Sequence, residues 1–131
     1  MPETSVDLDE IFDRLEGQLA RYAPPLVVRT GVVQGKRDFH LWSERPVEIA
    51  GRKRKEVSFA ALIAQKGYVG FYFMPVYADR ERRELFAPEL LALLKGKSCF
   101  HVKRLDDELD RHIEDALARG FELYRKRGWV D

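Results

Sequence analysis

The chain has 131 residues, of which 45% are hydrophobic and 34% are charged, and this balance excludes an intrinsically disordered protein. Its 23 basic and 22 acidic residues leave a net charge of +1, which provides no general attraction for nucleic acid or for a membrane surface. The length suits a single domain over residues 1–131. The one cysteine excludes an internal disulfide and favours a reducing compartment.

The first residues, MPETSVDLDEIF, are acidic and lack the basic region and the apolar run of a secretory signal. No apolar stretch approaches the roughly 20 residues that a membrane-spanning helix needs. We therefore expect a cytoplasmic protein with no membrane partner and no nucleic-acid partner.

An amphipathic helix is predicted from about Val6 to Tyr22, where apolar residues recur at helical spacing. Ser5 is the expected N-cap, and the acidic residues of the first turns suit the positive end of the helix dipole. Pro24 and Pro25 are expected to end the helix.

A β-rich segment follows, with strands predicted near Leu26–Thr30, Phe39–Ser43 and Val47–Ile49. Glycine and proline residues separate these strands. The basic run GRKRK, from Gly51 to Lys55, is interpreted as a solvated hairpin loop, and a phosphate-binding patch is the alternative.

The strongest pattern in the sequence is a β-hairpin around Lys66 and Gly67, which are expected to form a two-residue turn. In this register Gln65 faces Tyr68, and one face of the hairpin is entirely apolar. The residues of this predicted core face are Ala60, Leu62, Ala64, Val69, Phe71 and Phe73. The opposite face is mixed and is expected to include Phe59.

Three elements are predicted in the last third of the chain. A short helix runs from Pro88 to Leu94 and is closed by Gly96, and a strand follows from Ser98 to Lys103. A long helix runs from Asp106, its expected N-cap, to about Lys126. Because consecutive hairpins demand antiparallel pairing, this order of elements predicts an α+β two-layer sandwich.

The tripeptide Gly96-Lys97-Ser98 resembles the end of a phosphate-binding P-loop. A P-loop needs a glycine five residues earlier, where this chain has Leu91. It also needs a helix after the tripeptide, whereas here a helix is predicted before it. We therefore interpret the tripeptide as the end of a helix.

Cys99 and His101 raise the question of catalysis or of a zinc site. They lie two residues apart on one predicted strand, so their side chains run parallel, which is poor geometry for a nucleophile and its base. The sequence has no CxxC, HxxxH or HExxH pattern that would complete a zinc site. Cys99 is interpreted as a half-buried small residue, and an enzyme is the least favoured class.

Acidic residues gather at the start of both long helices. Those at 106–110 are explained by the favourable charge at a helix N-terminus. In the first helix Asp9, Asp13 and Glu16 form one stripe, which is typical of a solvated face. Weak binding of Fe²⁺ or Ca²⁺ is the alternative, because carboxylate oxygens are hard ligands.

Strand alternation predicts a second cluster, on the sheet face that points away from the core. With Phe100 and Val102 inward, the residues between and before them point outward. The predicted binding surface consists of His40, Trp42, Tyr68, Tyr72, Cys99 and His101. Exposed aromatic patches often mark interfaces, and the alternative is that the segment Val76–Phe86 or a dimer mate covers this one.

Three segments resemble the YdhG-like domain-of-unknown-function family, whose members are small bacterial cytoplasmic proteins. They are AQKGYVGFYF (Ala64–Phe73), LLKGKSCFHVKRLDDEL (Leu93–Leu109) and Tyr22-Ala23-Pro24 after the first helix. The fold of that family is similar to frataxin, which implies that both terminal helices pack on one face of an antiparallel sheet. Some members are described as frataxin-like iron chaperones.

The resemblance implies two sites. The one that would correspond to the acidic iron-binding ridge of frataxin contains Asp9, Glu10, Asp13 and Glu16. The one that would correspond to its partner-docking surface contains Trp42, Tyr68 and Tyr72. We therefore expect a non-enzymatic accessory protein with no required cofactor, with weakly bound iron if it is an iron chaperone, and with an unknown protein partner or a homodimer. The alternative is a protein-interaction or small-ligand-binding module that uses the open sheet face.

Overall fold

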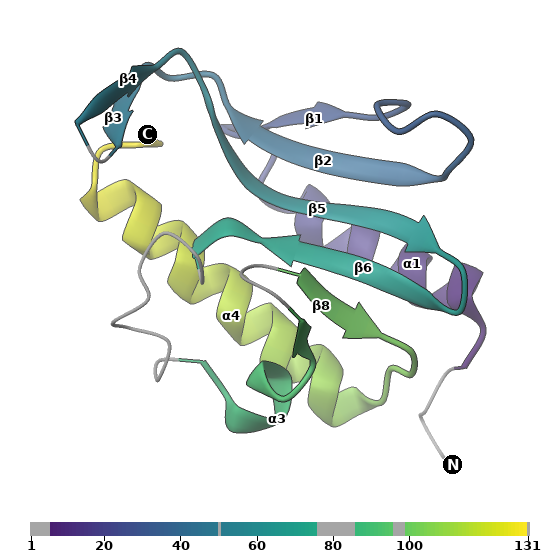
Figure 1. The fold of residues 1–131 in the computed structure, drawn as a ribbon. Helices are drawn as coiled ribbons and strands as arrows, with labels where there is room; N and C mark the ends of the chain where they lie inside the picture. Colours follow the sequence, from purple (N-terminus) through teal and green to yellow (C-terminus); the bar gives the residue numbers. More distant parts are fainter. Residues whose placement is uncertain (1–5, 50, 76–85, 96–98, 131) are drawn as a thin grey trace.

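Six antiparallel strands form the main β-sheet, and a separate ribbon contains two more. The six strands are β1 (Val27–Arg29), β2 (Asp38–Ser43), β5 (Val57–Gln65), β6 (Tyr68–Phe73), β7 (Leu94–Lys95) and β8 (Cys99–Val102). Across the sheet their order is β1-β2-β5-β6-β8-β7 (Figure 1). The ribbon pairs β3 (Val47–Ile49) with β4 (Arg52–Arg54). The structure is a computed structural model and describes residues 6–49, 51–75, 86–95 and 99–130.

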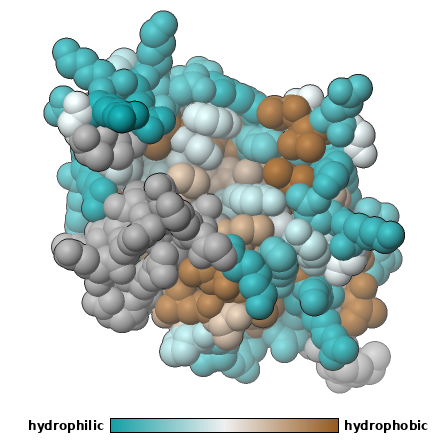
Figure 2. All heavy atoms as spheres, viewed as in Figure 1, coloured by the Kyte–Doolittle hydropathy of each residue, from teal (hydrophilic) through white to brown (hydrophobic). Residues whose placement is uncertain are grey.

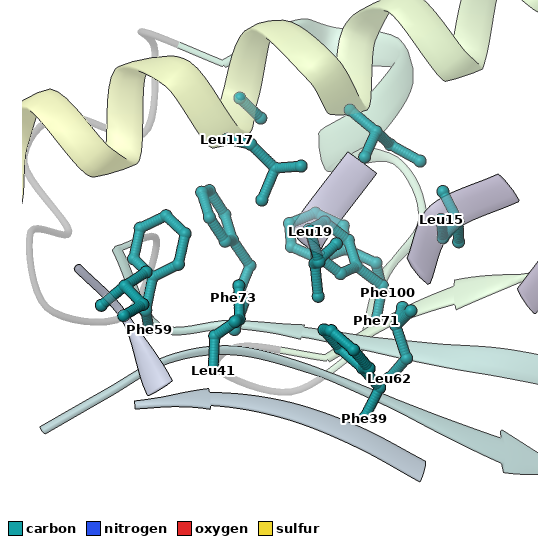
Figure 3. Packing of buried hydrophobic residues seen from close by; sticks show 14 of the residues in the cluster. Leu15, Leu19, Phe39, Leu41, Phe59, Leu62, Phe71, Phe73, Phe100 and Leu117 are labelled. Atoms are coloured by element: carbon teal, nitrogen blue, oxygen red, sulfur yellow. The ribbon is translucent and has the colours of Figure 1, made fainter. Parts of the chain in front are cut away.

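Helices from the two ends of the chain, α1 (Leu8–Ala20) and α4 (Asp107–Lys126), pack against one face of the main sheet (Figures 1 and 3). The short helix α3 (Pro88–Leu91) contacts α4. The predicted α+β two-layer sandwich is therefore confirmed. Within the described ranges, no helix combines the length and the apolar character needed to cross a membrane.

The hydrophobic core fills the space between the sheet and the two long helices. Figure 3 shows Leu15 and Leu19 from α1 and Leu117 from α4 directed toward the aromatic side chains of the strands. The fully buried aromatic residues are Phe12, Phe59, Phe71, Phe73, Phe100 and Tyr124. Burying side chains of this size is the main stabilising contribution to folding, at about 1.5–3 kcal/mol for each large apolar residue.

The central hairpin has the predicted register. Gln65 pairs with Tyr68 and Leu62 pairs with Phe71, on either side of the two-residue turn. Gly67 has a φ of 88°, a conformation that favours glycine because it has no Cβ. This hairpin sets which residues of β5 and β6 point toward the helices.

A β-bulge in β5 reverses one prediction about the hairpin. Leu41 pairs with Ala60, but the next residue, Trp42, pairs with Ser58, so Phe59 is an extra residue in its strand. The side chain of Phe59 therefore turns into the core, where it is fully buried and meets the ring of Phe73 edge to face at 5.6 Å. The prediction that Phe59 belongs to the outer face was wrong, because regular alternation does not hold across a bulge.

The ends of the first helix differ slightly from the prediction. Asp7 is the N-cap, and its carboxylate accepts a hydrogen bond from the amide of Asp9 at 3.0 Å. Ser5, the predicted cap, lies outside the described residues. The helix ends at Ala20, before the two prolines. In α4 the predicted cap is confirmed, because the Asp106 carboxylate accepts from the amide of Leu109 at 2.8 Å.

Two other predictions were wrong about short elements. The predicted helix over 88–94 ends at Leu91, and Leu94–Lys95 forms strand β7 along β8. The basic run at 51–55 is exposed and belongs to a hairpin as predicted, but Arg52–Arg54 is strand β4, paired with β3, and not a loop. The tripeptide Gly96-Lys97-Ser98 and most of the charged connection before Phe86 lie outside the described residues.

Candidate functional site

The face of the main sheet opposite α1 and α4, called the open face below, carries all six residues of the predicted binding surface. In Figure 1 α1 lies behind the sheet, so this view looks onto the open face. In the same view, Figure 2 shows residues of intermediate and high hydropathy over the sheet, with hydrophilic residues around them. The six predicted residues, each half-buried, are His40, Trp42, Tyr68, Tyr72, Cys99 and His101.

Pairing between strands arranges four open-face residues in one row. His40 pairs with Ala61, Ala61 pairs with Tyr72, and Tyr72 pairs with Cys99. The row crosses β2, β5, β6 and β8 in turn. In this row the small side chain of Ala61 lies between the larger side chains of His40 and Tyr72. Regular strand pairing thus unites residues that are far apart in the sequence.

Tyr68 and His101 form an aromatic stack next to this row. Their ring centroids are 4.0 Å apart and the planes differ by 16°. Parallel rings on neighbouring strands hold each other in one orientation and lose little entropy when a partner binds. The His101 ring therefore faces Tyr68, and it is not the partner of the Cys99 thiol.

Tyr72 lies across Gly70 and is held from two sides. A Cβ on Gly70 would come within 2.9 Å of the Tyr72 ring, so glycine is what permits this position. The side-chain amide of Gln65 donates to the Tyr72 hydroxyl at 3.3 Å. Burial, and then the hydrogen bond with Cys99, raises the pKa of Tyr72. Burial also raises the pKa of the Cys99 thiol, and the contact with Tyr72 lowers it by less.

His40 is fixed by the buried carboxylate of Asp38, at 3.1 Å from its Nε2. The same carboxylate accepts hydrogen bonds from the backbone amides of Gly31, Val32 and Val33 at 2.7, 2.8 and 2.7 Å. Burial acts to raise the pKa of Asp38, but the three amides and the His40 ring outweigh it and hold the pKa below its usual value. Asp38 therefore stays charged and orders the loop between β1 and β2.

The ring of Trp42, on the same face, is covered by the side chain of Arg29. The guanidinium of Arg29 sits 4.7 Å from the centre of the Trp42 ring, a cation–π contact. Arg29 also bonds the carboxylates of Glu56 at 2.8 Å and Glu44 at 3.1 Å. These hydrogen bonds, that to Glu56 first, raise the pKa of Arg29. Aromatic surface and arginine therefore occur together at this end of the open face.

A pocket of about 500 Å³ lies beside the edge strand β7, its neighbour β8 and the start of α4. Lys95 at the end of β7 and Lys103 and Arg104 after β8 supply cationic side chains to its lining. His101, the outer member of the aromatic stack, also lines it. Asp106 is its one acidic lining residue among those described. The sequence prediction included His101 but missed this pocket.

The carboxylates of α1 converge on an arginine. Asp13 and Glu16 form ion pairs with Arg37, and Asp9 lies 3.9 Å from the same guanidinium. Glu10 is exposed, and no ion pair of its carboxylate appears within the described ranges. The centre of the predicted iron-binding stripe is thus occupied by a positive charge that repels a metal cation.

One group of three metal-ligating side chains is found within the part of the chain that the structure describes. Glu89 of α3 and Glu108 and His112 of α4 place one ligand atom each within 4.8 Å of one another. The buried His112 Nε2 lies 3.3 Å from Glu89 and 3.5 Å from Glu108. Spacing along a helix could have indicated the Glu108–His112 pair, but only the docking of α3 on α4 adds Glu89.

Comparisons of the chain with protein-family models, with curated proteins and with solved structures found no match. The candidate sites therefore rest on the geometry of the chain itself.

Proposed function

We propose that the protein is a non-enzymatic accessory protein that binds a protein partner through the open face. The observation that supports this most is the ordered aromatic surface of the face, which no helix of the described ranges covers. Tyr68 is stacked on His101, and Trp42 is held under Arg29. Tyrosine, tryptophan and arginine are the residues enriched at protein interfaces and at their energetic centres.

The chemistry of the open face favours binding over catalysis. The raised pKa of the Cys99 thiol keeps it protonated at neutral pH, whereas a nucleophilic cysteine needs a lowered pKa. His101 is stacked on Tyr68 and does not pair with the thiol. A cytoplasmic location fits the single free thiol of the chain.

Iron handling by α1 is not part of this proposal. A ridge that delivers iron needs carboxylates that are free to take up the metal. Here Arg37 pairs with Asp13 and Glu16, and a hydrogen bond to Asp13 raises the pKa of Arg37. The ion pairs give these carboxylates a structural role, which is to attach α1 to the segment before β2.

Site-specific photocrosslinking in the cells that make the protein tests the docking surface. In the variant Tyr72→p-benzoylphenylalanine the probe stands in the middle of the open face. We expect irradiation to give one discrete adduct. An adduct of twice the chain mass identifies a second copy, and any other discrete mass identifies a different protein.

The matched control is Arg111→p-benzoylphenylalanine, which places the same probe on the exposed side of α4. It should not give the adduct formed at position 72. The proposal fails if position 72 gives no adduct, or if both positions give the same set. Circular dichroism of both variants before irradiation establishes that each probe is carried by the folded protein.

A further inference from the structure

The pocket beside β7 and β8 has a basic lining and shares only His101 with the predicted binding surface of the open face. We infer that it binds a small ligand through a phosphate group. The inference does not depend on the proposed partner, because it rests on the charge, the ion pairing and the shape of the pocket alone.

Two buried residues direct the cationic side chains into the pocket. Val102 and Leu105 are both fully buried and fix the two ends of the short connection between β8 and α4. Lys103 and Arg104 stand between these anchors and are exposed. Lys95 reaches the same pocket from β7, the neighbour of β8. Three positive charges from two segments therefore surround one concave surface.

The charge in the pocket is not balanced by the protein. Three cationic side chains face the single carboxylate of Asp106, which is already the cap of α4. The other acidic residues at the start of α4 are engaged elsewhere. Asp107 and Asp110 pair with Arg14, and Glu108 pairs with His112. An anion in the pocket would therefore relieve repulsion among the three cations.

Ion pairing distinguishes these three cations from several arginines elsewhere in the described part of the chain. Arg14, Arg29 and Arg37 each contact two or more carboxylates. Among the described residues, no carboxylate lies within ion-pair distance of Lys95, Lys103 or Arg104. Unpaired cations are common on exposed surfaces, as on β4, but here they line a cavity.

The shape and chemistry of the pocket fit a phosphate ester. Its volume of about 500 Å³ lies within the usual range for small-molecule sites. The Arg104 guanidinium can bond two phosphate oxygens at once, and the two lysines add point charges. Leu93 and Leu109 provide an apolar side for the remainder of the ligand.

Isothermal titration with inorganic phosphate, at constant ionic strength maintained with chloride, tests this inference. The wild-type protein should bind phosphate at one saturable site and should not bind acetate under the same conditions. The double variant Lys103→Gln with Arg104→Gln should weaken phosphate binding by roughly tenfold or more, because two charge-assisted contacts are lost.

The matched control is Arg52→Gln with Lys53→Gln, which removes two positive charges from the exposed strand β4. Its phosphate affinity should stay within about twofold of wild type, since distant exposed charges contribute little. If both double variants weaken phosphate binding equally, the binding is due to general charge attraction and the inference is overturned. Absence of saturable phosphate binding, or equal binding of acetate, would overturn it as well.

Discussion

At the scale of single residues, Asp38 is the side chain on which the open face depends most. Its carboxylate is almost completely buried, yet it accepts three backbone hydrogen bonds and contacts His40. A buried charge is tolerated only when its hydrogen-bonding capacity is used in this way. The residue joins the loop before β2 to the open face.

We expect Asp38→Asn to lower the free energy of unfolding by about 1–3 kcal/mol at pH 7, because one side-chain position changes from acceptor to donor and leaves a backbone amide unpaired. The folded pKa of Asp38 is lowered. Its ionisation therefore stabilises the fold above the unfolded value of about 3.9, and this contribution is lost as pH falls through the folded pKa.

Urea unfolding of both proteins at pH 7 and at pH 3 measures this effect. The difference between wild type and variant should be large at pH 7 and smaller at pH 3. Glu10→Gln, at an exposed position of α1, is the control and should change little at either pH. A difference that is independent of pH would contradict the role assigned to the charge.

At the scale of elements, the close contact between α4 and β6 depends on Gly120. A Cβ at this position would lie 2.5 Å from the ring of Phe73 and 2.7 Å from Pro75. Both contacted residues are buried, so neither can move aside easily. The helix can approach the end of β6 this closely because position 120 has no side chain.

Gly120→Ala should therefore destabilise the protein by about 1–3 kcal/mol, since the gain in helix propensity is smaller than the cost of overpacking. Gly17→Ala in α1 is the matched control, because a Cβ there meets nothing within 4 Å. It should be neutral or stabilising by up to about 1 kcal/mol. Thermal unfolding distinguishes the two, and equal effects would contradict the packing argument.

The periodicity of apolar residues was sufficient to predict the long helices and strands, but it was insufficient to predict the short ones. The hairpin register and α4 follow from apolar patterns that extend over many residues. Phe59 was assigned to the wrong face because a bulge depends on the pairing with β2, which is not a local property. Strands β4 and β7 contain few apolar residues and exist because a neighbouring strand supplies their hydrogen bonds.

Of the two candidate sites, the open face could be predicted from the sequence and the basic pocket could not. Alternation along β2, β6 and β8 was enough to place the six residues of the open face on one side of the sheet. The basic pocket could not be predicted, because Lys95 meets Lys103 and Arg104 only through the pairing of β7 with β8. The net charge of only +1 for the whole chain also conceals this local excess of positive charge.

At the scale of the whole molecule, a polar junction joins the N-terminal and C-terminal helices. Asp110 of α4 accepts a hydrogen bond from Arg14 of α1 at 3.0 Å and another from the side-chain amide of Gln18. Gln18 also donates to the backbone carbonyl of Asp110 at 3.1 Å. Residues more than 90 positions apart in the sequence are thus held together at one point of the helix layer.

Asp110→Ala should lower the free energy of unfolding by about 1–3 kcal/mol, because it removes the carboxylate that accepts hydrogen bonds from the half-buried Arg14 and from the buried Gln18. Asp115→Ala, which removes an exposed pair with Arg119 on the same helix, should cost less than about 0.5 kcal/mol. Chemical denaturation of these two variants, of Arg14→Ala and of the double variant Arg14→Ala with Asp110→Ala measures the coupling. Additive effects of Arg14→Ala and Asp110→Ala would contradict a direct interaction.

The strand order also determines how the sheet meets other molecules at its margins. β1 at one edge has three residues and β7 at the other has two. An incoming strand could form few backbone hydrogen bonds with either, so growth by strand addition, as in amyloid or domain-swapped chains, is disfavoured. Within the described residues, the two edges of the main sheet therefore offer little template for edge-to-edge aggregation beside its broad aromatic surface.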